Sequence, residues 1–355
     1  MRLLALSRYG RLGASSRLRT LQYLPWLERA GIHTVHHALL NDSYVQALYR
    51  HERAALSVVR GYLRRLKLLL DARQFDALFV EKEALPWIPA ALEMSLLPKN
   101  VPLIFDLDDA VFHRYDRHFS WIVRRLLGSK IDKLLGHCSA VTVGNRYLGD
   151  RAVAAGCKRV EVIPTVVDLE RYGNRLRKHL GEQTVVIGWI GSPASAHYLG
   201  EVVEPLRRLC ARYSLSCLAI GANREQVRDT PFVSVPWEED TEVDVLHSID
   251  IGIMPLCDGP WERGKCGYKL IQYMACGVPV VASAIGANRD IVKDGDNGFL
   301  VETDAQWCEA LERLIVSPAL RARVGLEGRR SVEQTFSLQV QAGRLVEVLR
   351  SVAGR

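Results

Sequence analysis

The segment at residues 259–281, GPWERGKCGYKLIQYMACGVPVV, restricts the fold of this chain more than any other. It begins as a glycine-rich loop and continues into a short helix that we predict over residues 268–275. Gly277 is expected to end this helix, because glycine readily takes the left-handed conformation found after helix C-termini. The apolar, β-branched run at residues 278–282 then has the length and composition of a buried parallel strand. The segment therefore predicts a parallel α/β fold.

The same segment predicts an anion site at the start of its helix. The first N–H groups of a helix lack partners within it, and its dipole is positive at that end. Lys265 and Lys269 add positive charge there. We expect the ligand to be a diphosphate. The alternative is that the two lysines are simply solvated, four positions apart on one helix face.

Several blocks in the second half of the chain together resemble one enzyme family. KLIQYMACGVPVVAS at residues 269–283 is followed by Gly286, Asp290, DGDNGFLV at residues 294–301 and a helix that opens at Asp304. This order and spacing is similar to the donor-binding half of the group 1 (family 4) glycosyltransferases, which are retaining enzymes. The resemblance extends through residue 336 and implies the GT-B fold, an α/β architecture of two Rossmann-like domains facing across a cleft.

The chain departs from the family at two acidic positions. The family usually has glutamates where this chain has Gly264 and Gln272, and the resemblance assigns them to the donor sugar and the nucleotide ribose. Gln272 can still hydrogen-bond a ribose hydroxyl. Gly264 supplies no side chain, and Glu262 lies nearby in a different register. The sequence therefore leaves two questions open: which residue binds the donor sugar, and whether activity is lost.

The resemblance also implies a donor-binding loop after the strand at residues 184–190. The family normally places an Arg and a Lys on this loop, and GSPAS here has neither. We expect the basic residues at positions 263, 265 and 269 to replace that charge. The predicted donor-binding residues are Gly191, Ser192, Arg263, Gly267, Tyr268 and Gln272.

In the first half, a strand at residues 2–7 leads into the loop and helix RYGRLGASSRLR. The resemblance implies that this loop faces the acceptor and the donor phosphates. An ordinary capped helix with surface arginines is the alternative. The predicted acceptor-binding residues are Gly13, Ser16, Arg17 and Arg19.

A later strand, at residues 101–105, is followed by DLDDAVF. Ligands bind at such strand ends in doubly wound sheets. A carboxylate there can orient or deprotonate an acceptor hydroxyl. Helix capping or a salt bridge to Arg114 or Arg117 is the alternative. We predict no metal and no cofactor, because the resemblance is to GT-B enzymes, which do not use a D-x-D metal site. The predicted catalytic residues are Asp108, Asp109, Lys265 and Lys269.

Positive charge is concentrated in the first half of the chain. Residues 1–180 hold 29 Lys and Arg against 17 Asp and Glu, whereas the remainder holds 18 against 23. A helical region over residues 42–73 also places an apolar face beside a basic stripe. This pattern suits an anionic membrane surface, and equally suits a helix packed on its own domain. No nucleic-acid-binding signature is present.

Length and composition indicate a two-domain globular protein. The 355 residues are 48% hydrophobic and 25% charged, and the eight cysteines form no Cys-x-x-Cys pair. We expect no signal peptide and no spanning helix, and a cytoplasmic location, peripheral on the inner face of the plasma membrane. The predicted boundaries are an N-terminal domain at residues 1–165, a linker at 166–183, a C-terminal domain at 184–336 and a helix at 337–355 that crosses back to the N-terminal domain.

The function implied by the resemblance is sugar transfer, of the hexosyltransferase type, with retention. The donor is a nucleotide-sugar, and the acceptor is a hydroxyl of a glycan or a lipid-linked glycan in polysaccharide or cell-envelope biosynthesis. A GT-B epimerase or a degenerate nucleotide-binding scaffold are rivals, the latter motivated by Gly264. A nicotinamide dehydrogenase is disfavoured, because no Gly-x-Gly-x-x-Gly follows the first strand.

Overall fold

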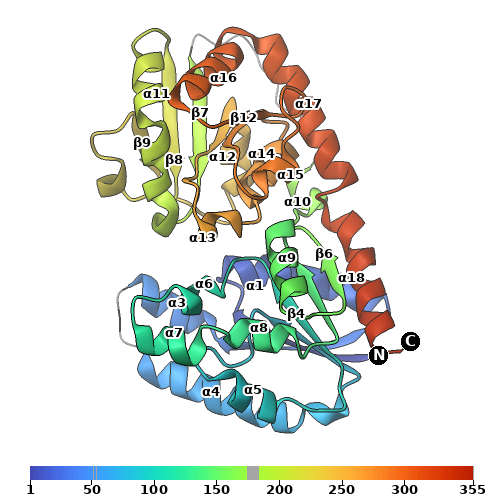
Figure 1. Ribbon diagram of the computed structural model, residues 1–355. Coiled ribbons are helices and arrows are strands. Elements are labelled where there is room, and N and C mark those ends of the chain that lie inside the picture. The colour runs from blue at the N-terminus through green and yellow to red at the C-terminus, as the bar shows by residue number, and fades with distance from the viewer. Residues whose placement is uncertain (51, 53, 174–183, 355) are drawn as a thin grey trace. The chain divides into compact units, whose positions relative to one another are not determined.

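The computed structural model describes residues 1–50, 52, 54–173 and 184–354, and the chain divides into two compact units (Figure 1). Unit 1 comprises Met1–Thr165, Gly264–Cys266 and Gln341–Arg355. Unit 2 comprises Val166–Arg263 and Gly267–Val340. The linker predicted at residues 166–183 lies partly outside the described residues, since residues 174–183 are not among them.

Unit 1 is built on a six-stranded parallel sheet with the strand order β2-β1-β3-β4-β5-β6. Its central strands are mostly apolar, and every residue of β3 and β5 is buried. Such a composition is typical of parallel strands that are covered by helices on both faces. The strands are β1 (Arg2–Tyr9), β2 (His33–Leu40), β3 (Ala77–Glu81), β4 (Leu103–Leu107), β5 (Ala140–Val143) and β6 (Val160–Val162).

The strand order determines which face each helix of unit 1 covers. Connections between parallel strands are right-handed, so reversing the direction of travel across the sheet changes the face. The chain moves one way from β1 to β2 and the other way from β2 onward, so α4, α5, α8 and α9 share a face opposite α1 and α2. The helices are α1 (Ala14–Arg19), α2 (Leu24–Arg29), α3 (Asp42–Tyr49), α4 (Ala55–Leu70), α5 (Ala90–Leu96), α6 (His113–Asp116), α7 (Trp121–Leu127), α8 (Lys130–Leu135), α9 (Arg146–Ala154) and α18 (Leu338–Val352), of which residues 341–352 belong to this unit.

A buried ion cluster joins α5, α8 and the segment after β3 in unit 1. The Lys130 ammonium lies 2.6 Å from Glu83 Oε2 and 3.0 Å from Glu93 Oε2, and it also donates to the Leu85 carbonyl at 2.6 Å. The Tyr115 hydroxyl donates to Glu83 at 2.8 Å. Desolvation by burial raises the pKa of Glu93 despite Lys130. Lys130, Glu83 and Glu93 are all buried. The charge on each is therefore compensated by its partners and not by water.

Unit 2 contains a second six-stranded parallel sheet, ordered β12-β11-β10-β7-β8-β9. Its strands are β7 (Val185–Ile190), β8 (Leu215–Ile220), β9 (Phe232–Val235), β10 (Ile251–Met254), β11 (Val280–Ser283) and β12 (Phe299–Val301). Its helices are α10 (Leu169–Tyr172), the 3₁₀ segment η3 (Pro193–Leu199), α11 (Gly200–Cys210), α12 (Glu242–His247), α13 (Pro260–Arg263), α14 (Tyr268–Ala275), α15 (Asn288–Ile291), α16 (Asp304–Val316) and α17 (Pro318–Gln334).

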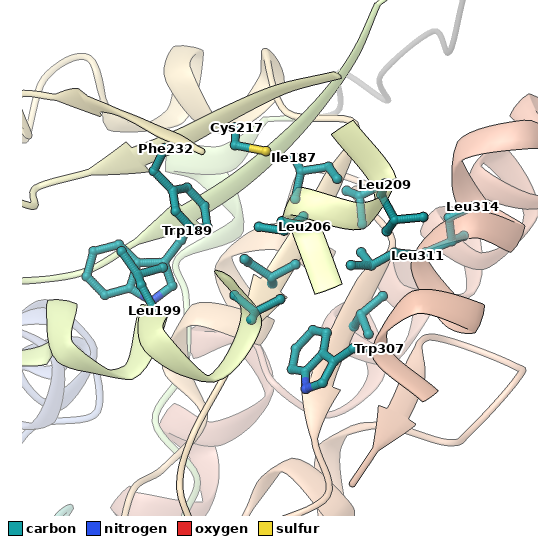
Figure 2. Close-up of a cluster of buried hydrophobic side chains, with 14 of the residues drawn as sticks. Ile187, Trp189, Leu199, Leu206, Leu209, Cys217, Phe232, Trp307, Leu311 and Leu314 are labelled. Atoms are coloured by element: carbon teal, nitrogen blue, oxygen red, sulfur yellow. The ribbon is translucent and has the colours of Figure 1, made fainter. Parts of the chain in front are cut away.

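One hydrophobic core of unit 2 lies between the sheet and the helices α11 and α16 (Figure 2). Trp189 of β7 is fully buried in it, and Trp307 of α16 is almost completely buried. A fully buried Trp anchors its strand firmly, because its large apolar surface is removed from water. The C-terminal end of β7 is therefore a rigid platform.

The helix predicted over residues 268–275 and the buried strand after it are both observed, as α14 and β11. Two other predictions are wrong in detail. The sequence also predicts a helix over residues 83–97 that Pro86 and Pro89 interrupt, and only α5 is observed, because Trp87 has a positive φ of 63° that a right-handed helix does not allow. The single helical region expected over residues 42–73 is two helices, α3 and α4.

Candidate functional site

The carboxyl edge of the sheet in unit 2, where the parallel strands end, brings together residues that the sequence places far apart. The Lys269 ammonium lies 4.0 Å from the Trp189 ring centroid and 3.4 Å from the Ser195 hydroxyl oxygen. A Cβ atom at Gly191 would lie 2.5 Å from this ammonium. Glycine is therefore required there for the lysine to reach the end of β7. The structure thus brings together the predicted residues Gly191 and Lys269.

Lys269 is the second residue of α14, so its charge adds to the positive end of the helix. Gly267 precedes the helix in the left-handed conformation, with φ 64° and ψ 18°, and no side chain caps the first turn. Tyr268 is half-buried at the first helical position. Uncapped N–H groups beside a lysine are the features on which the predicted anion site of this segment depends.

Two charged residues of α13 differ in their surroundings. The Arg263 guanidinium forms two 2.8 Å hydrogen bonds to the Asp258 carboxylate on the exposed surface. The Tyr198 hydroxyl of η3 donates a short hydrogen bond to Glu262. Since Ser195 and Tyr198 both belong to η3, this segment contacts both the Lys269 ammonium and the Glu262 carboxylate.

Gln272, predicted to bind a ribose hydroxyl, is buried and donates from Nε2 to the Tyr172 hydroxyl at 3.1 Å. Tyr172 in turn contacts Glu242 Oε1 at 3.3 Å, and the Trp237 indole donates to Glu242 Oε2 at 2.7 Å. The Gln272 amide nitrogen is therefore occupied within unit 2. Its contact with the nucleotide stays a prediction.

The carboxyl edge of unit 1 contains a network around Asp108. The Lys82 ammonium lies 2.9 Å from Asp108 and 3.3 Å from Asp109. The Ser15 hydroxyl contacts Asp108 and lies 3.0 Å from Glu81. Burial alone would raise the pKa of Asp108, but Lys82 and Ser15 outweigh it and the pKa is lowered. Asp109 is the more accessible of the two predicted catalytic carboxylates, with about a third of its side chain (34%) exposed.

Lys82 is held in this network by an unusual backbone. It adopts a left-handed conformation directly after β3, which costs a non-glycine residue roughly 1–3 kcal/mol. Burial lowers its pKa in isolation, but Asp108 and Asp109 together raise it above the ordinary value. The buried Lys82 ammonium therefore stays charged and holds the Asp108 and Asp109 carboxylates in place.

The acceptor-binding residues predicted on α1 have different environments. Arg19 is buried and forms a two-point ion pair with Asp106, Nε–Oδ2 2.9 Å and Nη2–Oδ1 2.6 Å. Ser16 is buried and donates to Glu81 at 2.6 Å. Arg17 donates to the Arg11 carbonyl at 3.2 Å, and Gly13 stands at the helix N-cap. Ser16 and Arg19 therefore connect α1 to the strand ends β3 and β4.

The segment Gly264–Cys266 belongs to unit 1. A Cβ atom at Gly264 would lie 2.4 Å from the Ala110 Cβ and 2.8 Å from the Ala110 nitrogen, so a larger residue does not fit. Cys266 donates from Sγ to the Asp108 carbonyl at 2.7 Å, and Asn145 donates to the Lys265 carbonyl at 2.9 Å. Lys265 and Lys269, predicted to act together, belong to different units.

Sequence reasoning did not identify several residues of these edges, namely Lys82, Ser15, Trp189 and Tyr198. Only Lys82 left a signal, because the charged triplet EKE directly follows the apolar run ALFV at residues 77–80. Within the described part of the chain, no helix is both long and apolar enough to cross a membrane. The same residues contain no group of three or more His, Cys, Asp or Glu that could hold a metal ion.

The chain is similar to known proteins in both sequence and fold. Residues 184–317 match the family model for group 1 glycosyl transferases. D-inositol 3-phosphate glycosyltransferase of Xylanimonas cellulosilytica is 25% identical over 232 residues, 58% of this chain and 54% of the relative. Phosphatidyl-myo-inositol mannosyltransferase of Mycobacterium tuberculosis is 23% identical over 349 residues, 90% of this chain and 86% of the relative. The chain thus aligns with about half of the first relative's length and most of the second's.

Solved structures extend the comparison to the fold of the whole chain. HepE from Anabaena, in complex with UDP and glucose, has a TM-score of 0.73 at 18% identity and covers 99% of this chain and 100% of its own. Sucrose-phosphate synthase from Thermosynechococcus elongatus has a TM-score of 0.72 at 14% identity, with 99% of each chain covered. The resemblance to the group 1 glycosyltransferases is therefore confirmed, by the family match over residues 184–317 and by a GT-B fold along the chain.

Proposed function

We propose that this chain is a glycosyltransferase that moves a hexose from a nucleotide-sugar to an acceptor hydroxyl, with retention at the anomeric carbon. The observation that carries the proposal is the position of Lys269. Its ammonium is fixed over Trp189 beside Gly191, at the uncapped start of α14. A cation and a helix N-terminus at one strand end suit the diphosphate of such a donor.

The relatives narrow the class of donor. HepE structures contain UDP, UDP with glucose, or UDP-glucose, and the curated relatives carry glycosyltransferase and mannosyltransferase names. We therefore assign a nucleoside diphosphate sugar to unit 2 and take UDP-glucose as the first probe. GDP- and ADP-sugars complete the set of donors to be compared.

In this proposal, Lys269 acts on the leaving group. Negative charge grows on the β-phosphate as the bond to the sugar breaks, and a fixed ammonium and the N–H groups around Tyr268 stabilise it. Removing one such donor typically costs two to three orders of magnitude in rate. Arg263 and Ser192 complete the proposed phosphate contacts within unit 2, and Gln272 the ribose contact.

Glu262 is our candidate for the sugar hydroxyls. The position at which the family has a glutamate is Gly264, and the contact with Ala110 leaves no room for a side chain there. Glu262 lies two residues earlier, and Tyr198 orients its carboxylate. A carboxylate held by a tyrosine of η3 can accept hydrogen bonds from a sugar.

We assign the acceptor hydroxyl to Asp109 in unit 1. Asp109 is partly exposed and oriented by Lys82, whereas Asp108 is buried and serves mainly to hold Lys82 and Ser15. The acceptor attacks the same face of the sugar from which the diphosphate leaves, which gives retention without a protein nucleophile. We assign no metal to this reaction, since Asp106 and Asp108 are already paired with Arg19 and Lys82.

We further propose that the acceptor is a glycan or lipid-linked glycan of polysaccharide or cell-envelope biosynthesis, used at the cytoplasmic face of an anionic membrane. The excess of positive charge in residues 1–180 supports an anionic surface as partner.

The test is UDP release from UDP-glucose, with and without candidate acceptors, by the wild type and the Lys269→Ala variant. We expect release by the wild type and a loss of at least a hundredfold in the variant. Ligand-induced thermal stabilisation separates binding from turnover, since a ligand at a hundredfold excess over Kd adds about 2.7 kcal/mol. Stabilisation of the wild type without release or transfer of sugar would identify a nucleotide-binding scaffold instead.

A further inference from the structure

We propose that unit 1 binds an anionic membrane surface through an exposed apolar face that we call the docking face. This inference names the partner surface within the proposed function, on which it rests for its biological use. The docking face consists of Leu56, Val59 and Leu63 of α4, Trp87, and Phe119, Trp121, Ile122 and Leu126 at and around α7.

The exposure of these side chains is unusually high. Phe119 is 91% exposed, Leu56 is 73% exposed and Trp121 is 64% exposed. Single exposed apolar side chains are ordinary, but a group of eight that includes three aromatic residues indicates a surface that binds something. Large aromatic side chains are favoured at the boundary between lipid headgroups and acyl chains.

Contacts within unit 1 join the two parts of the docking face. The Tyr62 hydroxyl of α4 donates to the Pro86 carbonyl at 2.6 Å, next to Trp87. The Trp87 ring meets the His118 ring edge-on at 5.7 Å, and His118 contacts Phe119 at 4.3 Å between ring centroids. The apolar residues of α4 and α7 are therefore linked through residues 86–87 and 118–119. Figure 1 shows α4 and α7 in this unit.

The backbone that carries Phe119 is tied to α7. Arg124 donates from Nη1 to the His118 carbonyl at 2.6 Å and to the Phe119 carbonyl at 2.9 Å. A fixed tip loses little conformational entropy when it enters a bilayer, so more of its apolar burial is retained as binding free energy. The exposure of Phe119 is thus a property of an ordered turn.

Charge identifies the partner as a membrane. Residues 54–70 and 117–131 contain no Asp or Glu, and both segments carry exposed basic side chains. A second copy of this chain would bring like charges together in a twofold contact, which is unfavourable. Anionic headgroups complement the charge while the acyl boundary accepts the apolar side chains. The exposed basic residues are Arg60, Arg64 and Lys67 on α4, and Arg117, Arg124 and Arg125 at α7.

The experiment is co-sedimentation of the full chain with phosphatidylcholine vesicles that contain or lack phosphatidylglycerol, without donor or acceptor. The first variant, F119S/W121S, removes the apolar tip, and the second, R60Q/R64Q/K67Q, removes charge from α4. The matched control is V233S/V316S, since both valines are exposed in unit 2, by 60% and 59%. All substituted side chains are exposed, and thermal unfolding verifies that each variant is folded.

We expect the wild type and the control to bind only the vesicles with phosphatidylglycerol. A basic residue near such a surface contributes about fivefold in partitioning, so the triple variant should lose roughly a hundredfold. F119S/W121S should bind at least tenfold more weakly, because each aromatic side chain loses its burial in the lipid boundary. Reduced accessibility of Trp121 to an aqueous quencher on vesicle binding would support insertion of the tip.

Vesicle binding that both variants retain at the wild-type level would overturn the proposal. So would a dimeric wild type that F119S/W121S converts to a monomer, because the apolar face would then serve a second copy of the chain. Since no sugar is present, this assay is independent of catalysis. A chain that binds vesicles but transfers no sugar would refute the proposed function and leave the docking face supported.

Discussion

The Lys269 ammonium lies 4.0 Å from the Trp189 ring centroid, and the ring is fully buried in the core of unit 2. Because the ring is rigid, the position of the charge is defined before any ligand binds. We predict that Lys269→Ala lowers kcat by two to three orders of magnitude. We expect Lys269→Arg to fail as well, since a planar guanidinium does not present its donors as a compact ammonium does. Initial rates of UDP release check both variants, and a fully active arginine variant would contradict this account of the site.

Gly191 provides a second test of the same arrangement. An alanine Cβ there would lie 2.5 Å from the Lys269 ammonium and 2.5 Å from the Trp189 ring. We expect Gly191→Ala to weaken thermal stabilisation by UDP and to lower the free energy of unfolding, because the buried ring cannot move aside. Gly200→Ala is the matched control, since a Cβ atom there meets nothing within 4 Å. Equal effects of the two substitutions would argue against a special role for Gly191.

Much of the fold is readable in the sequence. Short apolar β-branched runs between helical segments predict two parallel sheets, and α14 agrees with its prediction to the residue. The turn at residues 82–89 is readable only in part. Pro86 and Pro89 disfavour a helix there. The positive φ of Lys82 is not readable, because it accompanies the buried pairing with Asp108 in the folded protein.

The candidate site is readable only in part. Lys269 and Gly191 follow from a resemblance and from the physics of helix ends. The Lys82 bridge to Asp108 and Asp109 does not, because it depends on strands β3 and β4 being neighbours in the sheet. Consecutive strands are neighbours in roughly two-thirds of cases, but their order does not show which side chains meet at the strand ends.

A substitution at Asp109 should affect sugar transfer to the acceptor without affecting donor binding. We predict that Asp109→Asn lowers the transfer rate by about two to four orders of magnitude, the usual contribution of a general base. Thermal stabilisation by UDP should be unchanged, because the donor is assigned to unit 2. Glu161→Gln, a partly exposed carboxylate paired with Arg159 in the same unit, is the control and should retain the wild-type rate. Wild-type transfer by the Asp109 variant would exclude this carboxylate as the base.

The buried Lys130 ammonium should be essential for stability. Lys130→Met leaves Glu83 and Glu93 buried without their cation, and breaking such a cluster costs about 3–5 kcal/mol. Lys133→Met on the same helix is the control, because Lys133 is exposed. Urea unfolding monitors both variants. A loss below about 1 kcal/mol for Lys130→Met, the range of surface pairs, would mean that water reaches the cluster.

His36 should make stability depend on pH. Its Nε2 lies 2.8 Å from the Ser7 hydroxyl oxygen, and burial, with smaller effects of His37 and Arg65, lowers its pKa to about 4. Between pH 6.5 and about 4 the unfolded chain binds a proton that the folded protein does not, so stability falls as the pH falls. We expect His36→Gln to flatten this slope in urea unfolding between pH 7 and 5. An unchanged slope would show that His36 becomes protonated in the folded protein.

The contact between Gly264 and Ala110 has a consequence for redesign of the chain. Restoring a glutamate at position 264 by a single substitution would force its Cβ onto the backbone nitrogen of Ala110, which cannot retreat as a side chain can. The segment after β4 and the loop before α14 are thus matched to one another in shape. Consensus engineering at position 264 would have to take both segments from the same homologous sequence. Among homologues, the two segments should vary together.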